Sequence, residues 1–200
     1  MGTVPNYIVG IGGSAGSLIA FKAFLLALPS NTGMAFVFVA HILPEANSYL
    51  AEILSRCTDM PTMVASTGVS IQANHVYVSS PNSDLLVENY HFKIVSPRTK
   101  RNVLVDNLFT SLADSMGACA IGIVLSGYHH DGTEGCKQIK MKGGITFAQD
   151  SSADVGDMPI SAQDAGYIDF VLPPSKIAEE LAKIGSTANG KLSPDRLRKK

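Results

Sequence analysis

Three residues of the types that together perform acyl transfer each follow a stretch with the composition of a buried strand. Ser14 stands in a glycine-rich turn after a short β-rich run, His41 follows a continuous apolar run, and Asp131 lies in the loop after another. In such a set the serine hydroxyl attacks a carbonyl carbon, the histidine takes its proton, and the aspartate fixes the tautomer and orientation of the imidazole. The glycines around Ser14 allow a sharp turn that brings backbone N–H groups, and the start of the next helix, close to an oxyanion.

The runs that precede these residues predict a parallel sheet. Ala35–Ala40 and Ala120–Leu125 are continuously apolar, as in strands buried on both faces, and the opening third alternates strand-like and helix-like segments. Because ligands bind beyond the carboxyl ends of parallel strands, Ser14, His41 and Asp131 are expected to meet at one edge. The predicted fold class is α/β, a doubly wound, mostly parallel sheet with helices on both faces.

The middle of the chain is different. Val76–Val78, Leu85–Val87 and Phe92–Val95 are short β-rich runs separated by turn residues, a pattern typical of inserted hairpins. The segments expected after them are a helix over Val105–Met116, a helix near Glu134–Lys142, strands over Ile145–Ala148 and Tyr167–Val171, and a helix over Ile177–Ile184 capped by Ser175. Residues 1–184 are therefore expected to form one domain, and the polar, basic residues 185–200 a tail or linker remnant.

Composition excludes several classes of protein. Of 200 residues, 46% are hydrophobic and only 16% charged, which excludes a disordered chain. A formal net charge of -1 gives no basis for charge-driven binding to nucleic acid. Three dispersed cysteines indicate a reducing compartment rather than a disulfide framework. No apolar run approaches the roughly 20 residues of a membrane helix, and no signal peptide is visible, so a cytoplasmic protein without membrane insertion is expected.

Taken singly, each of the three residues has an ordinary structural explanation. A serine in a glycine-rich turn caps a helix or binds phosphate, a histidine after a strand is often structural, and an aspartate before Gly132 often forms a turn or caps a helix. Gly10-x-Gly12-x-x-Ala15 also fits a dinucleotide-binding fingerprint. The second strand, however, ends at His41, where that fingerprint needs an acidic residue for the ribose. The residues alone leave a triad and a nucleotide site both open.

A metal site is a third possibility. His129, His130 and Asp131 are adjacent and could ligate, but no other close cluster of His or Cys joins them. We therefore expect neither a metal nor a cofactor.

Together, several segments resemble the catalytic domain of the chemotaxis receptor methylesterases, the CheB family. The segments, in chain order, are IGGSAG (11–16), AHILP (40–44), LSGYHHDGTEG (125–135), GG (143–144), AQD (148–150), MP (158–159) and SA (161–162). The resemblance extends from about residue 7 to 184. It implies a doubly wound α/β domain with a catalytic triad that hydrolyses glutamate γ-methyl esters on receptor helices and releases methanol; some members also deamidate glutamines.

Carried over motif by motif, the resemblance makes Ser14 the nucleophile, His41 the base and Asp131 its orienting partner. It places the oxyanion and substrate-binding groups at Gly13, Ala15, Tyr128, His129 and Met158. The implied partners are methylated chemoreceptor helices. The family commonly carries a receiver domain, for which residues 1–6 leave no room, so a fragment or a differently regulated form is expected. Val103–Ala113 and Leu172–Pro174 resemble forms joined to a methyltransferase, which makes such a domain, or a regulatory one, an expected partner in a longer protein.

Two segments depart from the family pattern. The nucleophile turn of the family reads Ser-Thr-Gly-Gly, and here it is Ser14-Ala15-Gly16-Ser17. The family loop reads Gly-Met-Gly-x-Asp-Gly, and here His129 replaces its second glycine. If that position requires a positive φ, histidine is strained there. The alternative function is therefore a catalytically impaired homologue that acts as a binding module.

Overall fold

The computed structural model describes residues 3–41, 44–98, 100 and 102–186. Within them, seven strands form one sheet in the order β3-β4-β2-β1-β7-β8-β9, and every neighbouring pair is parallel. The strands are β1 (Ile8–Gly13), β2 (Ala35–Ala40), β3 (Thr62–Val64), β4 (His75–Val78), β7 (Ala120–Val124), β8 (Ile145–Gln149) and β9 (Phe170–Leu172). The expected α/β class with a doubly wound parallel sheet is confirmed. Most of the tail predicted over 185–200 lies outside the described residues, as do Ile42 and Leu43.

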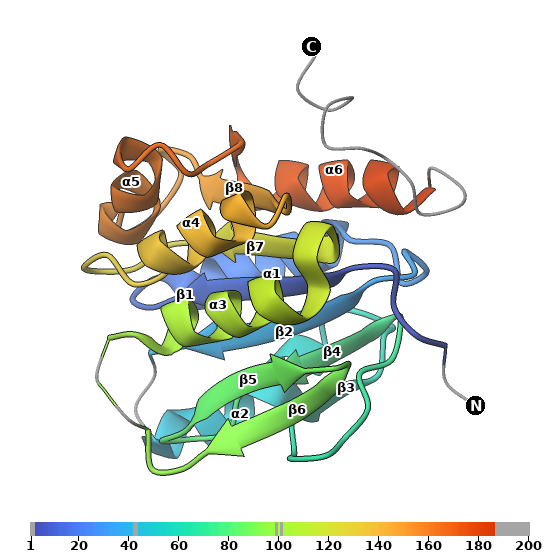
Figure 1. The fold of residues 1–200 in the computed structure, drawn as a ribbon. Helices are drawn as coiled ribbons and strands as arrows, with labels where there is room; N and C mark the ends of the chain where they lie inside the picture. Colours follow the sequence, from blue (N-terminus) through green and yellow to red (C-terminus); the bar gives the residue numbers. More distant parts are fainter. Residues whose placement is uncertain (1–2, 42–43, 99, 101, 187–200) are drawn as a thin grey trace.

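Helices cover both faces of this sheet, as Figure 1 shows. They are α1 (Ser17–Ala27), α2 (Pro44–Ser55), α3 (Leu104–Met116), α4 (Thr133–Met141), α5 (Asp157–Asp164) and α6 (Pro174–Ser186), with a 3-10 turn, η1, over Gly117–Cys119. One hydrophobic core packs α1, α2 and α6 against one face, and a second packs α3, α4 and α5 against the other. The two cores hold the central strands β1, β2 and β7 rigidly between them.

The prediction of hairpins in the middle of the chain was only partly right. Leu85–Val87 and Phe92–Val95 do form an antiparallel pair, β5 (Asp84–Glu88) and β6 (His91–Val95), which packs on α3. Val76–Val78 instead belongs to β4, a parallel strand of the main sheet beside β2. Its side chains are buried on both sides, which a short apolar run does not distinguish from a hairpin. The edge strand β3 and the helix α5 were not predicted.

Two boundaries near the C-terminal end were also wrong. The last strand begins at Phe170 rather than Tyr167, because the Tyr167 carbonyl accepts a hydrogen bond from the Thr146 hydroxyl instead of pairing in the sheet. The last helix begins at Pro174, so Ser175 lies within its first turn and does not cap it. The Pro173 carbonyl accepts the first backbone N–H groups instead, and proline fits the first helical position because it needs no N–H there.

The glycines of β1 determine how closely α3 approaches the sheet. Gly10 and Gly12 lie inside the strand, and a Cβ atom at Gly12 would overlap the side chain of Val105. A Cβ at Gly10 would lie 2.7 Å from Leu112 Cδ1. The dinucleotide alternative is wrong for this reason, since its glycines must lie in the turn between strand and helix. These glycines instead let α3 pack closely on β1, with Val105 against Gly12 and Leu112 against Gly10.

Candidate active site

Ser14 is the first residue beyond β1, in the turn that leads into α1. Its N–H donates to the Ser126 carbonyl at 2.9 Å, and its own carbonyl accepts from Ser17 N–H at 3.1 Å. Gly16 has a φ of 76°, a left-handed conformation that favours glycine. Ser17 is already helical, so the serine that replaces a family glycine occupies an ordinary conformation. The altered turn therefore keeps its glycine at the position that needs one.

His41 and Asp131 are in direct contact, although 90 positions separate them in the sequence. His41 Nε2 lies 2.6 Å from Asp131 Oδ2, and Asp131 is completely buried whereas the His41 side chain is 12% exposed. A short bond between a ring nitrogen and a buried carboxylate is the relationship expected of a base and its orienting partner. The convergence of these two residues agrees with the expectation that they share one sheet edge.

The carboxylate of Asp131 is held by the start of α3. Its Oδ2 accepts Val105 N–H at 3.0 Å, and its Oδ1 accepts Asp106 N–H at 2.9 Å. The first backbone N–H groups of a helix have no partner within the helix and favour an anion. Asp131 therefore does cap a helix, but it caps α3 rather than the helix that follows it.

The orientation of the His41 ring defines which nitrogen is available for proton transfer. An ionised Asp131 accepts from Nε2–H, which leaves Nδ1 as the nitrogen with a free lone pair. His41 N–H donates to the Gly13 carbonyl at 3.1 Å, so His41 and Ser14 lie just beyond paired ends of neighbouring strands. Within the described residues, no hydrogen bond joins the Ser14 hydroxyl to His41. Such bonds are often long in free enzymes and shorten when substrate binds.

The five residues expected to form the oxyanion and substrate site have different surroundings. Among described residues, the backbone N–H groups of Ala15 and Tyr128 have no acceptor, whereas His129 N–H points to Asp157 Oδ2 at 3.4 Å. Gly13 is part of β1. Of the five, Ala15 and Tyr128 therefore keep a backbone N–H that no described group accepts.

Met158 lies beneath the site rather than on its surface. Its side chain is fully buried, and its N–H donates to the Gly127 carbonyl at 2.9 Å. A Cβ at Gly127 would overlap the Met158 sulfur and would lie 2.8 Å from Ser14 Cβ. The Met158 side chain thus supports the contact between Gly127 and Ser14, and its part in binding substrate stays a prediction.

Ser126 connects the nucleophile turn to the loop before α5, a role that the sequence did not indicate. Its hydroxyl donates to the Ala15 carbonyl at 2.7 Å and accepts Val155 N–H at 2.9 Å. Its N–H donates to Gln149 Oε1 at 3.0 Å. One feature of the sequence could have pointed to Ser126, since it directly follows the apolar run Ala120–Leu125, at the sheet edge expected for Ser14 and His41.

Asp106, in the first turn of α3, was also missed. Its Oδ1 accepts Gly132 N–H at 3.0 Å and Gly135 N–H at 2.7 Å. Burial, and secondly the negative charges of Asp131 and Glu134, outweigh these bonds and raise the pKa of Asp106 from 3.8 to about 6. An aspartate at the second position of the helix predicted over Val105–Met116 is a common surface residue, so nothing in the sequence distinguished it.

His129 has a φ of 70°, so the position does require the conformation that the family glycine adopts freely. A non-glycine residue there is strained by roughly 1–2 kcal/mol. His129 and His130 are exposed, whereas Asp131 is buried and faces His41 and α3. The three side chains therefore do not converge on a metal, and the described part of the chain contains no cluster of three or more His, Cys, Asp or Glu able to hold one.

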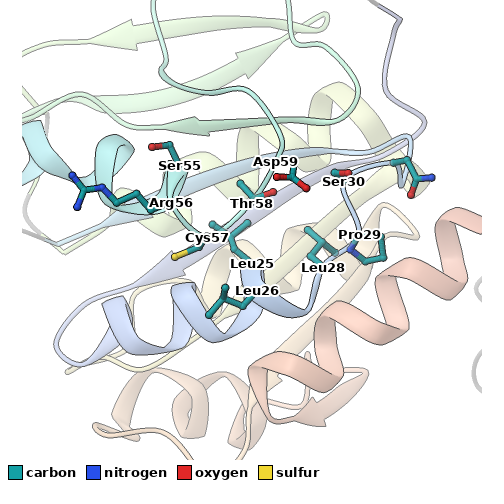
Figure 2. Close-up of a pocket in the computed structure, with 11 residues that line it drawn as sticks. Leu25, Leu26, Leu28, Pro29, Ser30, Ser55, Arg56, Cys57, Thr58 and Asp59 are labelled. Atoms are coloured by element: carbon teal, nitrogen blue, oxygen red, sulfur yellow. The ribbon is translucent and has the colours of Figure 1, made fainter.

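Two hollows differ in how they lie relative to the candidate site. A cavity of about 620 Å³ opens between the end of α1 and the loop after α2, lined by Leu26, Ser30, Arg56 and Asp59 among others (Figure 2). It lies near the amino ends of the strands, opposite Ser14. A smaller groove of about 290 Å³ lies beside the nucleophile turn, where Gly16 forms part of its wall.

Two further features bear on the environment of the chain. Cys57, Cys119 and Cys136 are free thiols, and burial raises the pKa of Cys119 and, most strongly, of Cys136. No helix in the described ranges combines the length and apolar character needed to cross a bilayer.

Known proteins are similar to this chain in sequence and in fold. The model of the CheB methylesterase family matches residues 9–181. A Leptospira interrogans protein is 34% identical over 173 residues, which cover 84% of this chain and 90% of the relative. The Geobacter sulfurreducens protein-glutamate methylesterase/protein-glutamine glutaminase 1 is 31% identical over 190 residues, which cover 90% of this chain and 52% of the relative, so the chain spans about half its length.

A solved structure agrees with these sequence matches. The catalytic domain of Thermotoga maritima CheB methylesterase superimposes with a TM-score of 0.82 at 28% identity, covering 90% of this chain and all of that domain. The family expected from the motifs is confirmed. On a match that spans most of its length and both cores, this chain belongs to the CheB methylesterase family.

Proposed function

We propose that this chain hydrolyses glutamate γ-methyl esters with Ser14, His41 and Asp131 and releases methanol. The observation that carries the proposal is the 2.6 Å contact between His41 Nε2 and the buried Asp131, at the sheet edge where Ser14 leaves β1. Relatives named protein-glutamate methylesterase/protein-glutamine glutaminase support the ester and, as a second substrate, the side-chain amide of glutamine.

The geometry suits an acyl-enzyme route. Ser14 Oγ attacks the ester carbonyl carbon while its proton passes to His41 Nδ1, and Asp131 holds the imidazolium that forms. The N–H groups of Ala15 and Tyr128 donate to the oxyanion. Collapse expels methoxide, which takes the proton from His41 and leaves as methanol. Water, activated by the same nitrogen, then releases the glutamate and restores Ser14.

The expected substrate is a methylated chemoreceptor, and the expected site of action is the cytoplasm, where free thiols persist. Fusion to a methyltransferase or a regulatory domain remains a proposal about a longer protein. The groove next to Gly16 offers room for the polypeptide that carries the ester.

One observation favours the alternative of an impaired binding module. His129 is strained, and it follows Tyr128, which is 54% exposed beside the nucleophile turn. The contact between His41 and Asp131 favours the enzyme, because a carboxylate that orients a histidine is what proton transfer from Ser14 requires. Methanol release from methylated chemoreceptor membranes decides between the two. The enzyme releases methanol, whereas a binding module binds the membranes and releases none.

A further inference from the structure

Asp131 and Asp106 each cap the helix at whose start the other one lies. Asp131 immediately precedes Gly132, the N-terminal cap of α4, yet its carboxylate accepts the N–H groups of Val105 and Asp106 in α3. Asp106 lies in α3, yet its Oδ1 accepts the N–H groups of Gly132 and Gly135 at the start of α4. Residue 106 thus holds Asp131 twice, by its backbone and by its side chain.

The two attachments act on different parts of Asp131. The Asp106 N–H bond orients the carboxylate of Asp131, while the Asp106 carboxylate holds the backbone one residue beyond it. A carboxylate that also contacts His41 cannot rotate or shift without moving the imidazole. The position of His41 Nδ1 therefore depends on a residue that contacts neither Ser14 nor His41 through any bond among the described residues.

Close packing around the contacts between Asp106 and the start of α4 leaves little room for another arrangement. A Cβ at Gly135 would lie 3.1 Å from Asp106 Cα and 2.5 Å from Phe109 Cβ. A Cβ at Gly132 would lie 2.9 Å from Val105 Cγ1. The starts of α3 and α4 therefore meet through glycines, at a separation that the Asp106 carboxylate spans.

We propose that Asp106 is a positioning residue for catalysis, which sets the orientation of Asp131 and, through it, of the His41 imidazole. The inference rests on the proposed ester hydrolysis and deepens it. One oxygen of Asp106 accepts two backbone N–H groups, and a side chain without that oxygen would leave both groups unpaired. The negative groups that face Asp106 are Asp131 and Glu134.

The test compares Asp106→Ala, which removes the acceptor oxygen, with Asp106→Asn, which keeps it and removes the charge. Asp114→Ala is the matched control, since Asp114 lies on the same helix but is exposed and pairs with Lys142. Methanol release is measured for each, with separate kcat and KM. For Asp106→Ala we expect kcat to fall about 10–100-fold with KM changed less than about 2-fold, since a displacement of an ångström costs about that much. For Asp106→Asn we expect kcat within about 3-fold of the unsubstituted protein.

A second readout does not depend on turnover. The proton that His41 Nε2 shares with Asp131 gives a downfield imidazole N–H resonance, which we expect to shift or broaden in Asp106→Ala and to persist in Asp106→Asn and Asp114→Ala. If Asp106→Ala does not fold, Asp106→Ser, whose oxygen stops one atom short, is expected to change the resonance and kcat in the same direction.

The outcomes separate the two proposals. A folded Asp106→Ala with unchanged kcat and unchanged resonance overturns the positioning role, and so does an Asp106→Asn as inactive as Asp106→Ala. A resonance that changes in Asp106→Ala, in a protein that releases no methanol in any form, supports the positioning role and refutes the esterase.

Discussion

Asp131 Oδ2 accepts two donors at once, the imidazole of His41 at 2.6 Å and the N–H of Val105 at 3.0 Å. One oxygen therefore belongs both to the candidate active site and to the N-terminus of α3. The orientation of the histidine depends on how firmly that helix is held against the sheet. The glycines of β1 let the helix pack closely on the sheet, and the hydrogen bond from Gly132 N–H to Asp106 Oδ1 holds its first turn in place.

For Asp131→Asn we expect a loss of roughly 10⁴-fold in kcat, because an amide favours the wrong tautomer of His41. The amide also places an NH₂ group against either the N–H groups of α3 or the ring. Asp150→Asn is the control, since Asp150 lies after β8 and its Oδ1 accepts only Ser152 N–H among the described residues. Steady-state methanol release from both variants checks this. A normal rate in Asp131→Asn together with a slow Asp150→Asn would transfer the orienting role to Asp150.

For His129→Gly we expect equal or higher activity, because glycine adopts the φ of 70° without strain. The free energy of unfolding should change by less than about 1 kcal/mol, since relief of strain in the folded chain is offset by the greater freedom of glycine in the unfolded one. Denaturant titration and initial rates measure the two quantities. A collapse of the rate at unchanged stability would show instead that the His129 side chain works in the reaction.

Ser126→Ala should reduce both stability and activity. It leaves the Ala15 carbonyl and the Val155 N–H without their partner, at about 1–3 kcal/mol for buried groups. It also frees the turn that carries Ser14, so we expect a several-fold lower kcat. Thermal unfolding and methanol release check this, with Ser152→Ala in the adjacent loop as the comparison. An unchanged melting temperature would mean that these bonds contribute nothing to the turn.

The pH dependence of stability should reveal the Asp106 carboxyl. Its pKa is raised from 3.8 to about 6 in the folded protein, so the folded state binds the proton more tightly than the unfolded state. The resulting contribution to stability is complete below about pH 4 and is lost as the pH rises through 6. Asp106→Asn lacks this loss. The free energy of unfolding of the unsubstituted protein, minus that of Asp106→Asn, should therefore fall between pH 4 and 7. If the two proteins show the same dependence of this free energy on pH, the raised pKa is contradicted.

Much of this architecture followed from patterns that depend on few residues. The continuous apolar runs at Ala35–Ala40 and Ala120–Leu125 predicted central strands, and polar residues in the segments after them predicted one functional edge. Parallel strands bring their carboxyl ends together whatever the connecting loops do, which is why the approach of His41 to Asp131 could be foreseen.

What could not be foreseen depends on tertiary contacts. Val76–Val78 has the composition of a hairpin strand, and only its place beside β2 makes it part of the parallel sheet. Met158 belongs to a recognisable motif, but its burial beneath Gly127 follows from the path of α5. The proposed role of Asp106 depends on its contact with the start of α4 at Gly132, which lies 26 positions away in the sequence. Neither propensity nor hydrophobic periodicity contains that information.

Ser14→Ala tests the central claim most directly. Methanol release from methylated chemoreceptor membranes is measured for the unsubstituted protein, for Ser14→Ala, and for Ser30→Ala, an exposed serine at the opposite edge of the sheet. We expect release from the unsubstituted protein and from Ser30→Ala, and a loss of at least about 10³-fold in a folded Ser14→Ala. Hydrolysis that continues unchanged in Ser14→Ala would contradict the assignment of Ser14 as the nucleophile.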